Sequence, residues 1–165
     1  MKTLKSLAVT AIIFLGYSVS FSQTPLNFNE GLKTAESSGK KIFIDIFSKS
    51  DKWSNKMDSE IYTLPEIQSA LSGFVFVKIN ADSQDKINYN GKDYTSVELA
   101  RSLGSTGYPT FLFMNPDGSI IKFKYNGDEE NNLCGFLSAQ DFKELLEFFS
   151  NESYKSSDLS TIFSN

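Results

Sequence analysis

The chain has 165 residues, of which 40% are hydrophobic and 22% charged, a composition typical of a globular protein. It contains no histidine and a single cysteine, which excludes Ser-His-Asp and Cys-His catalytic sites, histidine-ligated metal sites and a disulfide within one chain. The formal net charge of −4 gives no electrostatic reason to bind nucleic acid, so no nucleic-acid partner is expected.

Residues 1–22 have the pattern of a signal peptide. Lys2 and Lys5 precede an apolar run over residues 7–19, and small residues follow at the positions that a signal peptidase reads, which predicts cleavage before Gln23. The apolar run is shorter than the roughly 20 residues that span a bilayer. We therefore expect an exported protein, periplasmic or secreted, without an integral membrane span after cleavage. An uncleaved N-terminal anchor is the alternative.

The first half of the remaining chain alternates between helical and strand patterns. Apolar residues at helical spacing predict a helix over residues 28–38, and a nearly continuous apolar run over 41–47 predicts a strand covered on both faces. Helical spacing returns over 52–63 and 64–71, and a second buried strand is predicted over 74–79.

The second half begins with a predicted polar loop around residues 88–91, followed by a helix over 96–103. Strands over 110–114 and 119–125 flank the sequence Asn115-Pro-Asp-Gly118, a turn signal that predicts a hairpin. An amphipathic helix over 139–149 closes the domain, and residues 151–165 are predicted to form a polar, flexible tail. This order predicts one α/β domain over residues 23–150, with a mixed central sheet flanked by helices on both faces.

Four segments in this order resemble the thioredoxin family, in particular its exported thioredoxin-like members. They are residues 44–54, 78–82, 107–110 and 135–138, with further support from Lys56-Met-Asp58 and Pro65-Glu-Ile67. The resemblance implies a thioredoxin fold, a proline at 109 preceded by a cis peptide bond, and an active-site turn over residues 51–54. It implies no cofactor and no metal.

The chain departs from this family at the two positions where its members carry cysteines, because Asp51 and Ser54 stand there instead. Thiol–disulfide exchange needs an attacking thiolate and a second thiol to resolve the mixed disulfide. Neither a carboxylate nor a serine hydroxyl performs this reaction at ordinary pH. The sequence therefore predicts no catalytic residue at this turn, and Asp51 is expected to cap the helix that follows.

The resemblance also assigns roles to the residues around the turn. Asp45 is expected to be buried and to bond Ser54 or pair with Lys78, and Trp53 either lies exposed on a binding face or folds back onto its helix. The expected binding face comprises the degenerate turn residues Asp51, Lys52, Trp53 and Ser54, together with Tyr108, Pro109, Gly135 and Phe136. The one thiol, Cys134, adjoins this face and is either inert or redox-active.

Three functional interpretations remain open at this point. The first is a non-catalytic module that binds a polypeptide partner or client. The second is a single-cysteine thiol–disulfide redox protein that acts through Cys134. The third is acid–base chemistry by the carboxylates of Asp45, Asp51 and Glu60.

Overall fold

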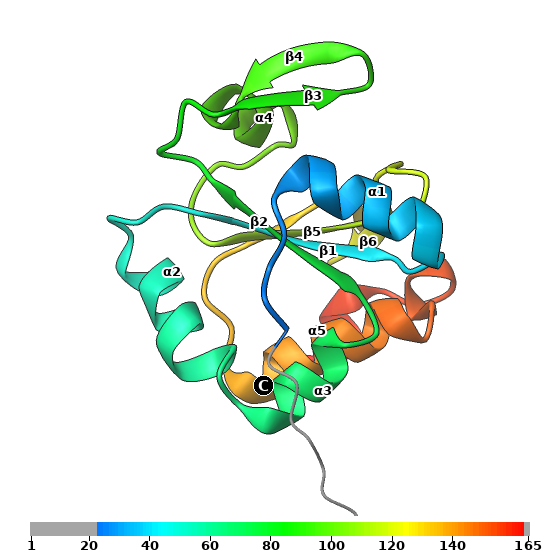
Figure 1. The fold of residues 1–165 in the computed structure, drawn as a ribbon. Helices are drawn as coiled ribbons and strands as arrows, with labels where there is room; N and C mark the ends of the chain where they lie inside the picture. Colours follow the sequence, from blue (N-terminus) through cyan, green and yellow to red (C-terminus); the bar gives the residue numbers. More distant parts are fainter. Residues whose placement is uncertain (1–22, 164–165) are drawn as a thin grey trace, which may run out of the picture.

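A computed structural model describes residues 23–163, so the predicted signal peptide lies outside the described residues. Its centre is a four-stranded sheet in the order β2-β1-β5-β8 (Figure 1). The strands are β1 (Ile42–Phe47), β2 (Val75–Asn80), β5 (Thr110–Met114) and β8 (Leu133–Cys134). β1 and β2 are parallel, whereas β5 is antiparallel to both β1 and β8. The predicted mixed sheet is confirmed.

Helices cover both faces of this sheet, as the sequence predicted (Figure 1). One face carries α1 (Phe28–Ser38) and α4 (Ser96–Ser102), and the other carries α3 (Pro65–Leu71) and α5 (Ala139–Ser150). Beside the sheet, α2 (Lys52–Lys56) continues into a π-helical turn, η1 (Met57–Ile61). In the described part of the chain, no helix combines the length and the apolar character that a membrane crossing requires.

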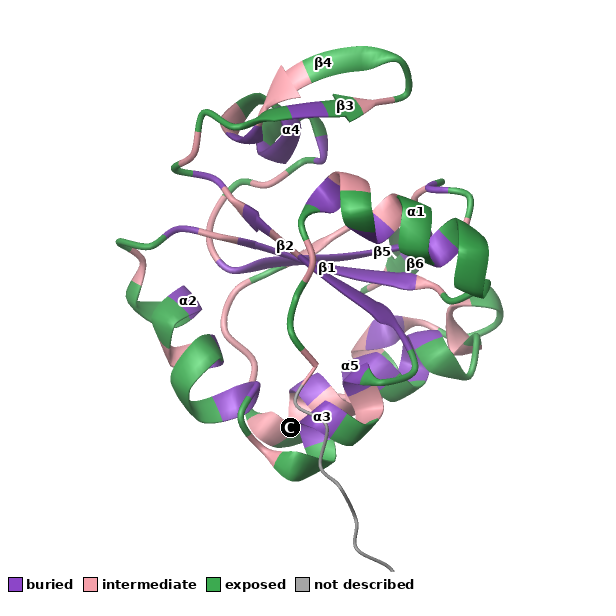
Figure 2. Ribbon diagram, viewed as in Figure 1, coloured by how far each residue is buried: buried purple, intermediate pink, exposed green. Residues whose placement is uncertain are grey.

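The two faces of the sheet bury different kinds of side chain. β5 is buried throughout and β1 is buried except at Phe47 (Figure 2). Phe43 of β1 lies on the α5 face, where its ring packs 5.3–5.9 Å from the rings of Phe76, Phe111, Phe113 and Phe142. Its neighbour Ile44 lies on the α1 face among aliphatic side chains. This alternation follows from the period of two in a strand and explains the nearly continuous apolar sequence of β1.

The position of α1 on the aliphatic face is fixed by its ends and by one glycine. The Asn27 side chain accepts a hydrogen bond from the amide of Glu30 at 3.0 Å, and Gly39 ends the helix with a φ of 70°. A Cβ at Gly31 would lie 2.2 Å from Cγ2 of Val77 on β2. Only glycine therefore lets this helix approach the sheet so closely.

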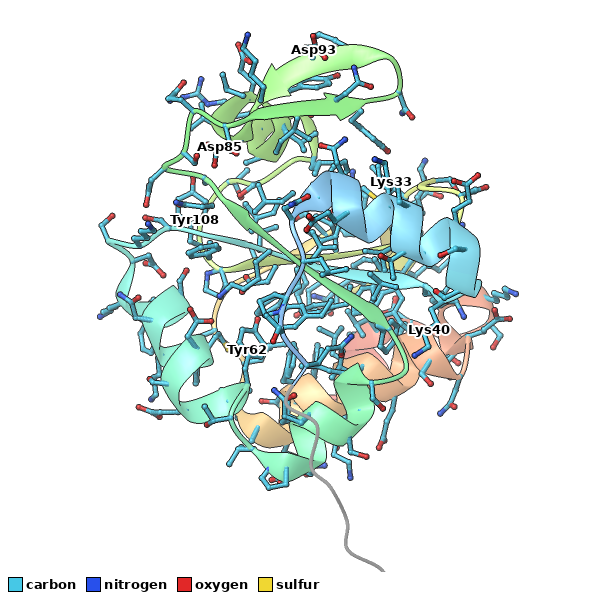
Figure 3. The ribbon with its side chains drawn as sticks, viewed as in Figure 1. Lys33, Lys40, Tyr62, Asp85, Asp93 and Tyr108 are labelled. Atoms are coloured by element: carbon cyan, nitrogen blue, oxygen red, sulfur yellow. The ribbon has the colours of Figure 1, made fainter. Side chains whose placement is uncertain are left out.

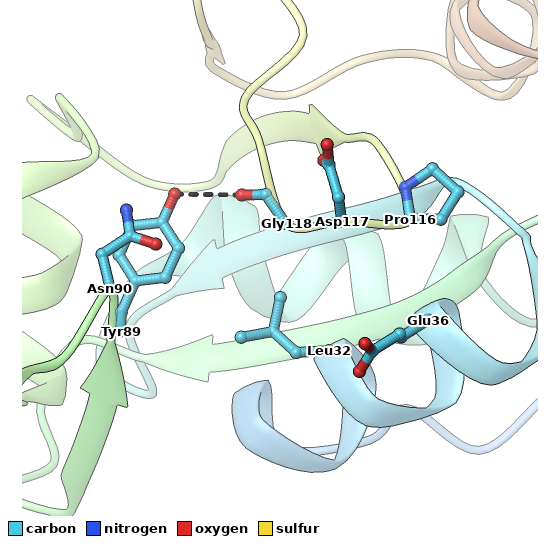
Figure 4. A pocket seen from close by; sticks show the side chains of 7 residues that line it. All are labelled: Leu32, Glu36, Tyr89, Asn90, Pro116, Asp117 and Gly118. Carbon is cyan, nitrogen blue, oxygen red and sulfur yellow. Dashed lines mark hydrogen bonds between the residues drawn. The ribbon is translucent and has the colours of Figure 1, made fainter.

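A hairpin occupies the segment where the sequence predicted only a polar loop. Strands β3 (Lys86–Tyr89) and β4 (Lys92–Thr95) are joined by Asn90 and Gly91, both of which have positive φ, at 52° and 73°. The Asn-Gly pair was the available signal for this turn. The Tyr89 hydroxyl donates to the Gly118 carbonyl at 3.0 Å, beside a cavity of about 470 Å³ between the hairpin, α1 and the turn after β5 (Figure 4).

The hairpin predicted over residues 110–125 forms only at its turn. Ile120 makes a single bridge to Met114, after which β6 (Phe123–Tyr125) turns away and pairs with β7 (Asp128–Glu130). Phe123 packs against Phe149 of α5, with ring centroids 5.3 Å apart. β8 takes the vacated place beside β5, and these short polar strands lacked an alternating pattern that would have revealed them.

The tail predicted to be flexible after residue 150 instead packs against the domain through residue 163. It contains the short helices η2 (Ser153–Lys155) and η3 (Leu159–Thr161), and Leu159 is fully buried in the aromatic core. Asp158 accepts hydrogen bonds from the amides of Asn126 and Gly127 at 3.0 and 2.8 Å. Tyr154, Leu159, Ile162 and Phe163 are the apolar side chains of this serine-rich segment, and their spacing was too irregular to predict this packing.

Replacement of Leu159 by alanine should therefore destabilise the whole domain. Removing a buried leucine side chain costs about 2–5 kcal/mol of unfolding free energy, and urea denaturation will measure this loss. Ser157→Ala is the matched control, because Ser157 is exposed in the same segment. Equal stability of Leu159→Ala and the wild type would mean that the tail does not pack as described.

Candidate functional site

Three segments that are distant in sequence meet beside the sheet. The amide of Gly135 donates to the carbonyl of Pro109 at 2.9 Å, and Cys134 lies opposite Thr110 in the ladder of β8 and β5. The Tyr108–Pro109 peptide bond is cis, as the resemblance implied. A Cβ at Gly107 would lie 3.0 Å from Sγ of Cys134, so the thiol adjoins the proline loop.

The third segment joins through an aromatic contact. Trp53, in the first turn of α2, packs on Phe136 with ring centroids 5.3 Å apart. Lys52 lies 4.7 Å from the centroid of the Trp53 ring, and Lys56 lies 4.8 Å from that of Phe136. Trp53 is nevertheless 40% exposed, and it is the one large hydrophobic side chain among the described residues that is exposed. The ring therefore packs on Phe136, in the loop between β8 and α5, and remains partly exposed at the expected binding face.

The turn itself is organised by Asp51 and Ser54. The Asp51 carboxylate caps α2 by accepting a hydrogen bond from the amide of Ser54 at 2.7 Å. Ser54 is only 1% exposed. Asp51 therefore has the capping role that the sequence predicted, and the Ser54 hydroxyl is not accessible to a substrate.

Behind the turn lies the fully buried carboxylate of Asp45, on the same face of β1 as Phe43. Lys78 stands directly opposite Asp45 on β2, and its Nζ lies 3.4 Å from the carboxylate. The same ammonium also contacts Asp58 and lies 4.2 Å from the centroid of the Phe47 ring. Of the two partners proposed for Asp45, the structure brings Lys78 into ion-pair range.

Several buried polar atoms at and around Asp45 lack a hydrogen-bond partner, even though Lys78 lies within ion-pair distance. Both carboxylate oxygens of Asp45, the hydroxyl of Ser54 and the hydroxyl of Tyr62 make no hydrogen bond of ordinary geometry to the described residues. Burial raises the pKa of Asp45 to about 6, although the Lys78 ammonium and the nearby Tyr62 hydroxyl counteract the shift. Burial also raises the pKa of Tyr62, which comes from the segment between α2 and α3 (Figure 3).

Tyr62 and Asp58 were missed by the sequence analysis as neighbours of Asp45. Tyr62 follows the π-helical turn η1, and that turn decides which side chains of this segment point inward. The Lys56-Met-Asp58 motif pointed to Asp58 as a family feature but not to its contact with Lys78. Neither contact has a signal in local sequence spacing.

Tyr108 differs from Trp53 in its surroundings. Its side chain is half-buried and packs against the aliphatic core (Figure 3). Its backbone amide and carbonyl make no backbone hydrogen bond to the described residues. Tyr108 therefore offers its backbone, more than its ring, to a molecule bound at this face.

The remaining candidate groups do not converge on a reaction centre. Cys134 is exposed and unpaired among the described residues. Glu60 lies 3.7 Å from Lys56, while Asp51 caps α2 and Asp45 pairs with Lys78, so each carboxylate has a separate partner. No cluster of three or more metal-ligating side chains occurs within residues 23–163.

The raised pKa of Asp45 predicts that this residue makes the domain less stable as the pH rises. The folded-state pKa of about 6 exceeds the ordinary value of 3.8, so the folded state holds the proton longer than the unfolded state. The difference corresponds to about 3 kcal/mol, lost between about pH 4 and pH 6. Asp45→Asn should abolish this component and should match or exceed the wild type in unfolding free energy at pH 7.

Urea denaturation of both proteins across this pH range measures the difference. Asp128→Asn, a change of the same type at an exposed position outside any ion pair of the described chain, should retain the wild-type dependence. A large loss of stability in Asp45→Asn at pH 7 would show instead that the fold requires the Asp45–Lys78 pair.

Comparisons with known proteins agree with this geometry. Residues 28–150 match the family model described as a thioredoxin-like domain. The solved thioredoxin from Thermus thermophilus is 21% identical and superposes with a TM-score of 0.56, covering 78% of this chain and 88% of its own. A putative disulphide-isomerase from Bacteroides thetaiotaomicron is 24% identical with a TM-score of 0.54, covering 79% and 92%.

A thioredoxin-fold protein from Helicobacter pylori is 14% identical with a TM-score of 0.57, covering 75% of this chain and 80% of its own. At these identities the solved structures show a common fold. No match was found among curated proteins. Because the family model spans most of the chain, and the strand order and cis-proline loop accord with it, this chain belongs to the thioredoxin-like domain family.

Proposed function

We propose that this protein is an exported, non-catalytic thioredoxin-like module that binds a polypeptide. One observation carries the proposal: exposed Trp53 packs on Phe136, in the loop whose Gly135 amide bonds Pro109, next to the unpaired Tyr108 backbone. Asp51 and Ser54 stand in place of the reactive pair. The architecture around the family's reaction centre is thus retained while its nucleophiles are absent.

The replacement residues support a non-catalytic role because both are engaged in structure. Asp51 satisfies an orphan amide at the start of α2, and the Ser54 hydroxyl is buried. The chain has no second thiol to resolve a mixed disulfide. Disulfide exchange at this turn is therefore chemically excluded.

An extended polypeptide fits the groups that remain. The amide and carbonyl of Tyr108 can pair with the backbone of an added strand, while the exposed face of Trp53 accepts an apolar side chain. Phe136 fixes the tryptophan ring, which lowers the entropic cost of ordering it on binding. Buried aromatic anchors of this kind supply much of the binding energy at protein interfaces.

A second candidate function rests on the exposure of Cys134. Its thiolate could attack an external disulfide, forming a mixed disulfide at Sγ and releasing the other sulfur as a thiolate. An external thiol would then have to release the bound molecule. The position of Sγ beside Gly107 would place that molecule at the same face.

The proposed export is tested by identifying the N-terminal residue of the mature protein. Mass spectrometry of the protein recovered from the producing cells should give a mature N-terminus at Gln23. An intact Met1 would support the membrane-anchored alternative.

We expect the protein to show no dithiol-dependent disulfide reductase activity above that of Cys134→Ser. An insulin-reduction assay with dithiothreitol compares the two proteins directly. Turnover present in the wild type and absent from Cys134→Ser would reject the non-catalytic interpretation and favour the single-cysteine redox function.

Trp53→Ala should weaken polypeptide binding by about thirtyfold, the effect of removing an anchor worth about 2 kcal/mol. The probe is a dye-labelled, reduced and alkylated unfolded protein without tryptophan, and fluorescence anisotropy gives the affinity. Because Trp53 is the single tryptophan of the chain, its own emission reports binding at this face in the wild type. The melting temperature should change little, since the ring lies at the surface, 40% exposed and outside both cores.

Two further variants make this test specific. Lys143→Ala, on α5 and outside the face, should bind like the wild type. Tyr108→Ala should lower the melting temperature, because its ring packs against the aliphatic core. It should weaken binding less than Trp53→Ala, because the variant keeps the backbone groups of Tyr108. Full-strength binding by a folded Trp53→Ala would show that the polypeptide does not use this face.

A further inference from the structure

A second large cavity, of about 630 Å³, lies where β1 and β2 end. Its walls come from the start of α1, from the segment that follows each of these two strands, and from the beginnings of β3 and α4. In open α/β sheets, ligands commonly bind outside the carboxyl ends of parallel strands. Apolar side chains, among them Leu26, Phe47 and Ile87, form one part of the wall.

The cavity carries an excess of positive charge in an otherwise acidic chain. Lys49 and Lys86 line it, and neither forms an ion pair among the described residues. Lys78 also lines it, although Asp45 and Asp58 already share that ammonium. Against these three cations stands one acidic lining residue, Asp85 (Figure 3).

Neutral donors face the same space. Oδ1 of Asn27 accepts from the amide of Glu30 and Oδ1 of Asn80 accepts from the amide of Asp82, which leaves both side-chain NH₂ groups available. The first amides of α1 have no partner within the helix, and an 11-residue helix places partial positive charge at this end. A cavity with these donors is arranged to receive an anion.

Ser96 adds a hydroxyl group to the polar part of the cavity wall. It lines the cavity and is only 4% exposed, yet its hydroxyl makes no hydrogen bond to the described residues. This oxygen is not among the buried unpaired side-chain atoms of the described residues, so it opens onto the cavity and is free to donate to a bound molecule. Its backbone amide, in contrast, is satisfied by the carbonyl of Asp85 at 3.0 Å.

We propose that this cavity binds a small organic anion, with a carboxylate or phosphate group on an apolar body. The anionic group meets Lys49, Lys86 and the Ser96 hydroxyl, and the apolar body rests against Phe47 and its neighbours. A volume of about 630 Å³ falls within the usual range for small-molecule sites and far exceeds that of an inorganic oxyanion. The site is separate from the polypeptide-binding face, so its occupation does not depend on the function proposed above.

Isothermal titration calorimetry tests the proposal with four compounds: phenyl phosphate, benzoate, inorganic phosphate and neutral benzyl alcohol. We expect saturable binding of at least one aromatic anion, weaker binding of inorganic phosphate and none of the alcohol. The two aromatic anions distinguish a phosphate ester from a carboxylate as the preferred group. Inorganic phosphate binding as tightly as the aromatic anions would overturn the organic part of the proposal, and no binding by either aromatic anion would overturn it entirely.

Variants locate the binding in this cavity. Replacing Lys49 and Lys86 together by glutamine should weaken binding roughly tenfold or more, and Ser96→Ala about fivefold. Lys33→Gln removes one positive charge from α1 outside the cavity and should bind like the wild type (Figure 3). Trp53→Ala should also bind like the wild type, which separates this site from the polypeptide face. Unchanged affinity in the double lysine variant would overturn the proposal.

Discussion

The burial of β1 on both faces is the constraint on which the rest of the structure depends. Its odd-numbered side chains face the aromatic core under α5, and its even-numbered side chains face the aliphatic core under α1. All side chains of β1 except that of Phe47 are buried, so Asp45 lies in an apolar environment. Lys78, directly opposite on β2, supplies the nearest compensating charge.

This buried pair links the fold to the polypeptide face. Behind this face, the carboxylate of Asp45 and the hydroxyls of Ser54 and Tyr62 are buried without hydrogen-bond partners among the described residues. Burial of polar groups without such partners costs free energy. At the surface, the Trp53 ring packs on Phe136, and the Tyr108 backbone makes no backbone hydrogen bond to the described residues.

Lys78 also connects these buried polar groups to the second cavity. Its ammonium is divided between Asp45 inside and Asp58 nearer the surface, and its side chain forms part of the cavity wall. The carboxyl end of β2 thus contributes to two regions with different chemistry, the buried cluster around Asp45 and the second cavity. The face around Trp53 presents aromatic rings and unpaired backbone, whereas the cavity presents cations and side-chain amides around a space that is open to solvent.

Local patterns in the sequence determined the elements whose periodicity is strong. The bounds of α1 follow from the Asn27 cap and Gly39. The apolar run of β1 predicted a strand buried on both faces. The order of these elements, with the motifs around Asp45, Pro109 and Gly135, was enough to predict the mixed sheet and the family. The absence of a second cysteine, which excludes dithiol chemistry, is likewise a property of the sequence alone.

Only the tertiary structure decided the rest, because the responsible contacts join residues far apart in the chain. The packing of Leu159, the departure of β6 from β5 and the stacking of Trp53 on Phe136 have no signal in local spacing. The choice of Lys78 over Ser54 as the partner of Asp45 was set by the register of β1 against β2. The cation-lined cavity arises because the ends of two strands and the start of a helix converge, and a sequence pattern read element by element cannot register that convergence.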